Sequence, residues 1–253
     1  VGGVGGAKLA LGLSHILPPE KLTVVVNTGD DFWHLGLRVC PDMDTVMYTL
    51  ADIVNPEFGW GVNGDTRTTL ETLSKHYGFE PWFGLGDKDI ATHLLRTHLL
   101  REGKTLTDIM QILTTKLGIK HPILPMTDAE VPTIVNTEEF GELGFQEYFV
   151  KHRWQPTVKS LHFRNIEQAS IPEKVYHAIK TATAILIAPS NPWLSIAPIL
   201  SVPGMRDLIV SADVPRVVVT PIIGGKAVKG PAAKIMGEMG LDVTAQAVLN
   251  YYG

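Results

Sequence analysis

The chain is 253 residues long, with 45% hydrophobic and 19% charged residues and a formal net charge of −4. This length suits one large α/β domain, and the composition argues against wholesale disorder. The near balance of charge gives no electrostatic reason to wrap nucleic acid, and the longest apolar runs are far too short to span a bilayer. A single cysteine, Cys40, excludes an intrachain disulfide and fits a reducing cytoplasm.

The beginning of the chain reads as a glycine-rich loop, a helix and a strand, which is how a βα-type unit begins. Residues 7–13 have helical spacing, and residues 22–26 are a β-branched apolar run typical of a covered parallel strand. We expect a further short strand to precede Val1. Residues 184–187 and 217–219 predict later strands of the same sheet.

The middle of the chain changes from helical to strand-like periodicity. Apolar residues recur every three or four positions in residues 42–54, 66–77, 89–101 and 106–117. Glycines that stop helices follow three of these segments, at Gly78, Gly103 and Gly118. Short strands are predicted at 131–136, 147–150 and 160–164, before residues 172–181 return to helix.

We therefore predict a single α/β domain over residues 1–253 with a Rossmann-like, mostly parallel sheet. A helical insertion covers about residues 42–118, and a strand-rich excursion covers about residues 123–165.

The glycine-rich segment at residues 2–8 (GGVGGAK) predicts a nucleotide site. Glycines let backbone amides approach a phosphate, and a helix N-terminus adds partial positive charge. The segment is not a Walker A motif, and Lys8 stands where a dinucleotide fingerprint needs its third glycine. A tight turn without a ligand is the alternative.

Acidic residues follow the first clear strand, in the NTGDD segment at residues 27–31. Ligands of open α/β sheets gather beyond the carboxyl ends of strands, and adjacent carboxylates raise a pKa or recruit a cation. A second acidic segment, PDMDT at residues 41–45, begins a helix, where Asp42 has the alternative role of a cap. Asp30, Asp31 and Asp44 are the predicted ligands of a magnesium ion.

A charged helix start at residues 86–89 (GDKD) leaves two interpretations open. Asp89, His93 and Arg96 are four and three residues apart, so they share one helix face. That face is either an edge that meets a ligand or a solvated surface with an ion pair.

Two later loops follow predicted strands. The PSNP segment presents Ser190 and Asn191, and residues 221–226 present Gly224, Gly225 and Lys226, with Lys229 beyond them. Three polar or glycine-rich loops at strand ends predict one shared pocket. The histidines lack the spacing of a zinc site, and no nucleophile elbow is present.

Taken in order, these segments resemble the 2-phospho-L-lactate transferase family, which makes the factor-420 deazaflavin coenzyme. The resemblance covers essentially the whole chain and is carried by residues 2–8, 27–31, 40–45, 59–61, 85–89, 92–93, 188–192 and 221–224. It implies a Rossmann-type fold whose helical part binds the acceptor, a magnesium requirement and a homodimer.

The resemblance also implies a reaction. A guanosine diphosphate-linked donor would pass 2-phospholactate or phosphoenolpyruvate to the ribityl hydroxyl of 7,8-didemethyl-8-hydroxy-5-deazariboflavin, and GMP would leave. Which of the two acids is carried stays open. The expected catalytic residues are Asp30 and Asp44, and Asp44→Asn is expected to cut turnover while leaving folding nearly unchanged.

Further site residues follow from the resemblance. The expected nucleotide contacts are Gly3, Gly5, Gly6, Lys8, Ser190, Asn191, Gly224, Gly225 and Lys226. The expected deazaflavin contacts are Asp44, Lys88, Asp89 and His93. Two other classes remain as alternatives: a non-catalytic regulator that binds nucleotide sugars, and a nicotinamide-dependent dehydrogenase with Asp30 on the ribose, which Lys8 disfavours.

Overall fold

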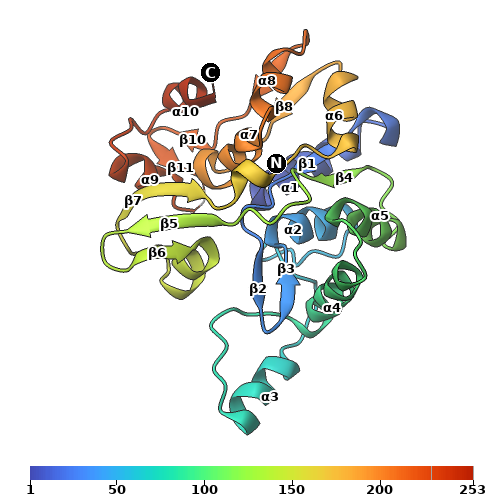
Figure 1. Ribbon diagram of the computed structural model, residues 1–253, viewed down its shortest axis with the longest axis vertical. Helices are drawn as coiled ribbons and strands as arrows, with labels where there is room; N and C mark the ends of the chain where they lie inside the picture. The colour runs from blue at the N-terminus through green and yellow to red at the C-terminus, as the bar shows by residue number, and fades with distance from the viewer. Residues whose placement is uncertain (229, 253) are drawn as a thin grey trace.

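The computed structural model describes residues 1–228 and 230–252, and its architecture is mixed α/β with parallel strands (Figure 1). Strand β1 (Val24–Val26) pairs in parallel with β4 (Ile123–Pro125), and β8 (Ile185–Ile187) pairs in parallel with β9 (Arg216–Val218). The predicted strands at 22–26, 184–187 and 217–219 are therefore confirmed, but they form two separate two-stranded sheets rather than the single sheet expected. Among the described helices, none has the length and apolar character needed to cross a membrane.

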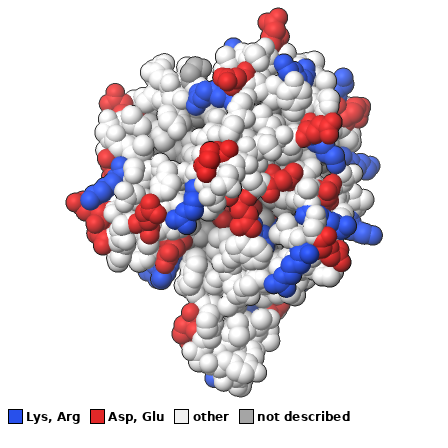
Figure 2. Space-filling view, in the orientation of Figure 1, with Lys and Arg blue, Asp and Glu red and all other residues white. Residues whose placement is uncertain are grey.

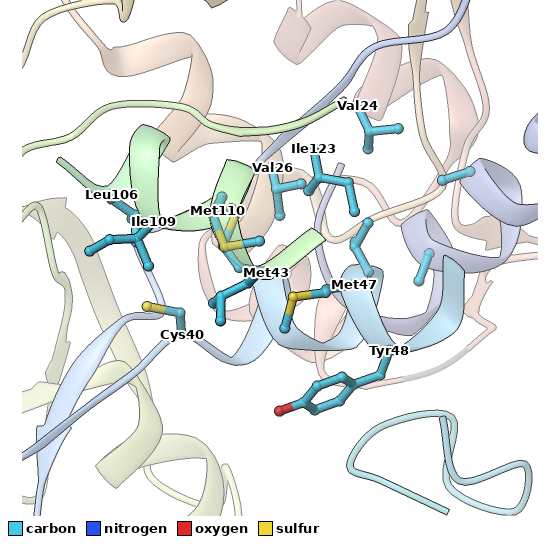
Figure 3. Packing of buried hydrophobic residues seen from close by; sticks show 14 of the residues in the cluster. Val24, Val26, Cys40, Met43, Met47, Tyr48, Leu106, Ile109, Met110 and Ile123 are labelled. Atoms are coloured by element: carbon cyan, nitrogen blue, oxygen red, sulfur yellow. The ribbon is translucent and has the colours of Figure 1, made fainter. Parts of the chain in front are cut away.

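The first core lies between β1, β4 and three helices: α1 (Gly3–Ser14), α2 (Pro41–Leu50) and α5 (Leu106–Lys116). Figure 3 shows the methionines of α2 packed between the strands and α5. Met43, Met47 and Ile109 are fully buried there. This packing places the first turn of α2 beside the carboxyl end of β1, because both are anchored in the same apolar cluster.

The middle helices follow the prediction closely. Helix α3 (Thr68–Tyr77) and α4 (Asp87–Arg101) precede α5, and Gly78, Gly103 and Gly118 have φ values of 63°, 83° and 73° at the helix ends. These left-handed conformations are the ones that favour glycine. Figure 1 shows that α3 projects away from the rest of the chain, and Figure 2 shows few charged side chains on this projection.

Two aspartates hold α3 and α4 together at their N-termini. Asp87, at the start of α4, accepts the backbone amides of Thr68 and Thr69 in α3. Asp65, just before α3, accepts the amides of Lys88 and Asp89 in α4. Each carboxylate thus satisfies free amides of the other helix, which fixes where Lys88 lies.

The strand-rich part contains one correction. Strand β5 (Thr133–Thr137) lies between β6 (Gly141–Gly144) and β7 (Val158–Phe163) and is antiparallel to both. The predicted strand at 147–150 is wrong, because Glu147–Lys151 forms a π-helix. Phe145 and Phe149 stack with their ring centroids 5.4 Å apart, so the aromatic residues follow a helical spacing that their strand propensity had hidden.

The remaining elements include two hairpins, β2 with β3 and β10 with β11. Their bounds are β2 (Phe32–His34), β3 (Leu37–Val39), β10 (Ile222–Ile223) and β11 (Lys226–Ala227). The other helices are α6 (Glu173–Lys180), a π-helix (Pro192–Ile196), α7 (Ala197–Ser201), α8 (Met205–Val210), α9 (Ala232–Glu238) and α10 (Ala245–Tyr252), with 3-10 turns at Pro19–Lys21 and Ile166–Gln168.

Candidate functional site

The glycine-rich segment forms the first turns of α1 and packs directly on the loop after β8. The Gly2 amide donates to Ser190 Oγ at 2.9 Å, and Ser190 Oγ donates to the Gly2 carbonyl at 2.7 Å. A Cβ atom on Gly5 would lie 2.5 Å from the Pro189 carbonyl oxygen, and one on Gly6 would lie 2.9 Å from Ser190 Oγ. The structure therefore brings two predicted loops together, and the glycines are needed for this close approach.

Asp42 connects the same helix to the loop after β1. Its Oδ2 accepts Asn27 Nδ2 at 2.9 Å, and its carboxylate also accepts the Gly3 amide. Asp42 makes no side-chain cap of its own helix α2, so the capping interpretation is wrong. Its contacts come from segments distant in sequence, so no local pattern pointed to this role.

Asp30 and Asp31 are buried at the carboxyl end of β1, and each has one carboxylate oxygen without a hydrogen-bond partner. Burial raises the pKa of Asp31 to about 7, although the Arg38 guanidinium opposes the shift. Burial and the neighbouring Asp42 carboxylate raise the pKa of Asp30 well above its ordinary range. Buried, unsatisfied carboxylate oxygens are suitable ligands for a hard divalent cation.

Two hydroxyls beside these carboxylates also lack a partner. Thr28 Oγ1 and Thr133 Oγ1 are buried without a hydrogen bond, and a Cβ on Gly29 would lie 2.7 Å from Thr133 Oγ1. The end of β1 thus gathers several unsatisfied oxygen atoms, as a site for a polar ligand or ion would.

Asp44 has different surroundings from the other two predicted metal ligands. It forms a two-pronged ion pair with Arg96, whose side chain is completely buried. Asp44, Asp89 and His93 also offer ligand atoms within 4.8 Å of one another, a spacing that could hold a metal ion. Because Arg96 already occupies the Asp44 oxygens, Asp30 and Asp31 fit a cation better.

Of the four predicted acceptor-binding residues, Lys88 alone lines a hollow of about 490 Å³. Lys88 lines it together with Tyr48 and Thr92, and Lys88 Nζ donates to the Asn63 carbonyl at 3.2 Å. Asp89 is connected to the hollow through Tyr48, whose hydroxyl donates to Asp89 Oδ1 at 2.7 Å.

His93 is buried rather than exposed on the ligand-facing edge that the sequence suggested. Its Nε2 lies 3.3 Å from Asp89 Oδ1, and its Nδ1 lies 3.6 Å from Asp44 Oδ2. Any effect of His93 on the acceptor would therefore pass through these two carboxylates.

The last predicted loop is the turn between β10 and β11. Gly224 and Gly225 have φ values of 57° and 75°, as a two-residue hairpin turn requires, and Lys226 is exposed. Ile222 of the hairpin belongs to the same apolar cluster as Trp193 and Leu194. Lys8 is exposed on α1, and Lys229 lies outside the described residues.

Asn191 caps a helix, a structural role in addition to the predicted nucleotide contact. Its Oδ1 accepts the amides of Trp193 and Leu194 and so caps the π-helix Pro192–Ile196. Its contact with a nucleotide stays a prediction. The nucleotide contacts of Gly3 and Ser190 also stay predictions, because the Gly3 amide already bonds to Asp42 and Ser190 Oγ already bonds to Gly2.

Comparison with known proteins identifies the family. Residues 1–252 match the family model described as "2-phospho-L-lactate transferase CofD". The chain is 44% identical over 251 residues to the 2-phospho-L-lactate transferase of Methanosarcina mazei, covering 99% of this chain and 82% of that protein. It is 43% identical over 256 residues to the phosphoenolpyruvate transferase of Streptomyces griseus, covering 100% and 80%.

Solved structures agree on the fold. A UPF0052-family protein from Bacillus halodurans superposes with a TM-score of 0.60 at 18% identity. The match covers 86% of this chain and 66% of that one. At this identity the likeness shows the fold alone.

Proposed function

Because this chain belongs to the 2-phospho-L-lactate transferase CofD family, we propose that it transfers 2-phospholactate or phosphoenolpyruvate from a guanosine diphosphate-linked donor to a deazaflavin. The acceptor is the ribityl hydroxyl of 7,8-didemethyl-8-hydroxy-5-deazariboflavin, and GMP is the leaving group. Relatives with both donor names match to nearly the same extent, so both acids remain candidates.

One observation carries this proposal: the glycine-rich start of α1, the loop after β1 and the loop after β8 meet at one place. Gly2 bonds to Ser190, and Asn27 bonds to Asp42 beside Gly3. Convergent polar loops at strand ends are the usual location of a phosphate site in α/β proteins.

Asp30 and Asp31 are the residues that would hold the proposed magnesium ion. Their unpartnered, buried oxygens supply the one or two carboxylates that magnesium commonly takes from a protein. When bound, the ion would neutralise negative charge on the diphosphate. The raised pKa of both carboxyl groups is consistent with a site whose charge a cation balances.

Side chains beside the acceptor would assist the transfer of the group and of the hydroxyl proton. The hydroxyl oxygen bonds to the phosphorus that carries the acid, the bond from that phosphorus to GMP breaks, and the hydroxyl proton passes to a carboxylate. Asp30, at the carboxyl end of β1, is the proposed proton acceptor. Asp44, held by Arg96, suits the orientation of the hydroxyl, and Lys88 lies in the adjacent hollow.

Cell location and assembly complete the proposal. A cytoplasmic location stays a prediction from the sequence. Homodimer formation stays a prediction from the family.

Incubation with magnesium, the deazariboflavin and each guanosine donor in turn tests the proposal. GMP and a fluorescent product of increased charge should appear together with at least one donor, and EDTA should abolish both. If neither donor gives a product and the protein binds a UDP-sugar tightly, the non-catalytic regulator would be favoured.

A further inference from the structure

Arg96 is a buried charge that the proposed nucleotide and metal contacts do not explain. It lies on α4, and its side chain has no exposed surface. Nη1 donates to Asp44 Oδ2 at 3.1 Å and to the Arg38 carbonyl at 3.2 Å, while Nη2 donates to Asp44 Oδ1. Two parallel bonds from a planar guanidinium fix the orientation of a carboxylate as well as its charge.

Arg96 also contacts His93. His93 Nδ1 lies 3.2 Å from Arg96 Nη1, and His93 Nε2 lies 3.3 Å from Asp89 Oδ1. Asp89 accepts the hydroxyl of Tyr48, which lines the hollow beside Lys88. Polar side chains therefore lie next to one another from Arg96 through His93 and Asp89 to the hollow.

Stability alone is a poor reason for such a pair. The desolvation of two buried charges often offsets their attraction, and apolar residues of similar volume can replace a buried ion pair without loss of stability. Arg96 moreover leaves its own Nε without a hydrogen-bond partner. A buried arginine committed to a proposed catalytic carboxylate points to a role in the reaction.

We propose that Arg96 is a positioning residue that acts through Asp44. It holds the Asp44 carboxylate in one orientation, so that the lone pairs not used by Arg96 can accept a hydrogen bond from the hydroxyl of the acceptor substrate. The proposal rests on the proposed function, in which Asp44 meets that hydroxyl.

A double-mutant cycle on turnover tests this role, with Arg96→Met, Asp44→Asn and the variant carrying both. Each single variant should lower kcat about 100-fold, within the range of one positioned acid–base group. The double variant should also lose about 100-fold, because residues that act as one unit do not add. The KM for the donor and the affinity for magnesium–GDP should change less than about twofold, because Arg96 acts on the acceptor side.

Arg101→Met is the matched control, since Arg101 is exposed in the last turn of the same helix. It should keep wild-type kcat. A purely structural role of Arg96 would instead make the two losses multiply to about 10,000-fold, as independent effects do. That result, or an Arg96→Met variant within about threefold of wild-type kcat, would overturn the proposal.

The role of Arg96 can still be tested if a single variant misfolds. Removal of both charges avoids an unpaired buried charge, so the double variant should fold even where Arg96→Met does not. Arg96→Lys, which keeps the charge but loses the planar fork, then replaces Arg96→Met and should lose about tenfold in kcat. Wild-type kcat in Arg96→Lys would contradict the positioning role.

An inactive wild-type protein would reject the proposed function, and this inference with it. An active Arg96→Met variant would reject the inference alone.

Discussion

Asp31 carries a pH dependence that its surroundings determine. In the folded chain its pKa is about 7, whereas an unfolded aspartate titrates near 3.9. Between about pH 4 and pH 7 the folded state therefore keeps a proton that the unfolded state has released, so stability falls as pH rises through this window. The full difference corresponds to about 4 kcal/mol.

We expect urea unfolding in EDTA to show this loss of stability between pH 5 and pH 8, and Asp31→Asn to reduce it. Arg38 keeps its partner Glu130 at 3.2 Å in that variant, so the substitution leaves no unpaired charge. Asp213→Asn, at an exposed position, is the control and should keep the loss. Magnesium should also reduce it in the wild type, and a stability profile that is equally steep with and without Asp31 would contradict the assignment.

Individual residues also show which parts of the site could be predicted from the sequence. The segments that contain Asp30, Ser190 and Lys88 could be identified because each combines polar residues with a strand end or a helix start. The partners of Asp42 and Asp44 could not, because they lie 15 and 52 residues away in the chain. Arg96 also changes the expectation for Asp44→Asn: the variant leaves a buried guanidinium unpaired and should lose about 3–5 kcal/mol of stability.

At the scale of elements, α1 offers a test in which two glycines of one helix behave differently. A Cβ on Gly5 would lie 2.5 Å from a backbone carbonyl, whereas nothing lies within 4 Å of one on Gly12. Gly12→Ala should therefore raise stability by about 0.5–1 kcal/mol, the usual helix-propensity gain. Gly5→Ala should lower it by about 1–3 kcal/mol, since backbone must move.

Thermal unfolding of the two variants measures this difference directly. Gly5→Ala should also weaken magnesium–GDP binding, because the start of α1 would separate from Pro189, while Gly12→Ala should bind like wild type. Equal stability of the two variants would mean that α1 does not approach the loop after β8 as closely as described.

The elements themselves were predictable where local signals agreed. Helices α3, α4 and α5 combine apolar spacing with glycine stops, and all three form close to the expected limits. The segment Glu147–Lys151 was misassigned, since its aromatic residues favour a strand locally while tertiary packing selects a π-helix. The hairpin of β2 and β3 was missed, because its turn uses Leu35 in a left-handed conformation that few non-glycine residues adopt.

At the scale of the whole molecule, the parallel strand pairs and the helices around them bring distant segments to one edge. α1, β1 and the loop after β8 meet there, while the hollow lined by Lys88 lies on the side of α2 and α4. Under the proposed function, this arrangement would separate the donor region from the acceptor region. The order of segments in the sequence predicted the convergence, and the contacts confirm it for Gly2, Gly5 and Ser190.

Crystals grown with manganese and GDP provide the most direct test, because manganese replaces magnesium and its anomalous scattering locates it. We expect the manganese ion on the carboxylates of Asp30 or Asp31, with the diphosphate beside the start of α1 and the loop of Ser190. Manganese and GDP bound instead at the Asp44, Asp89 and His93 group, or in the hollow beside Lys88, would contradict the account.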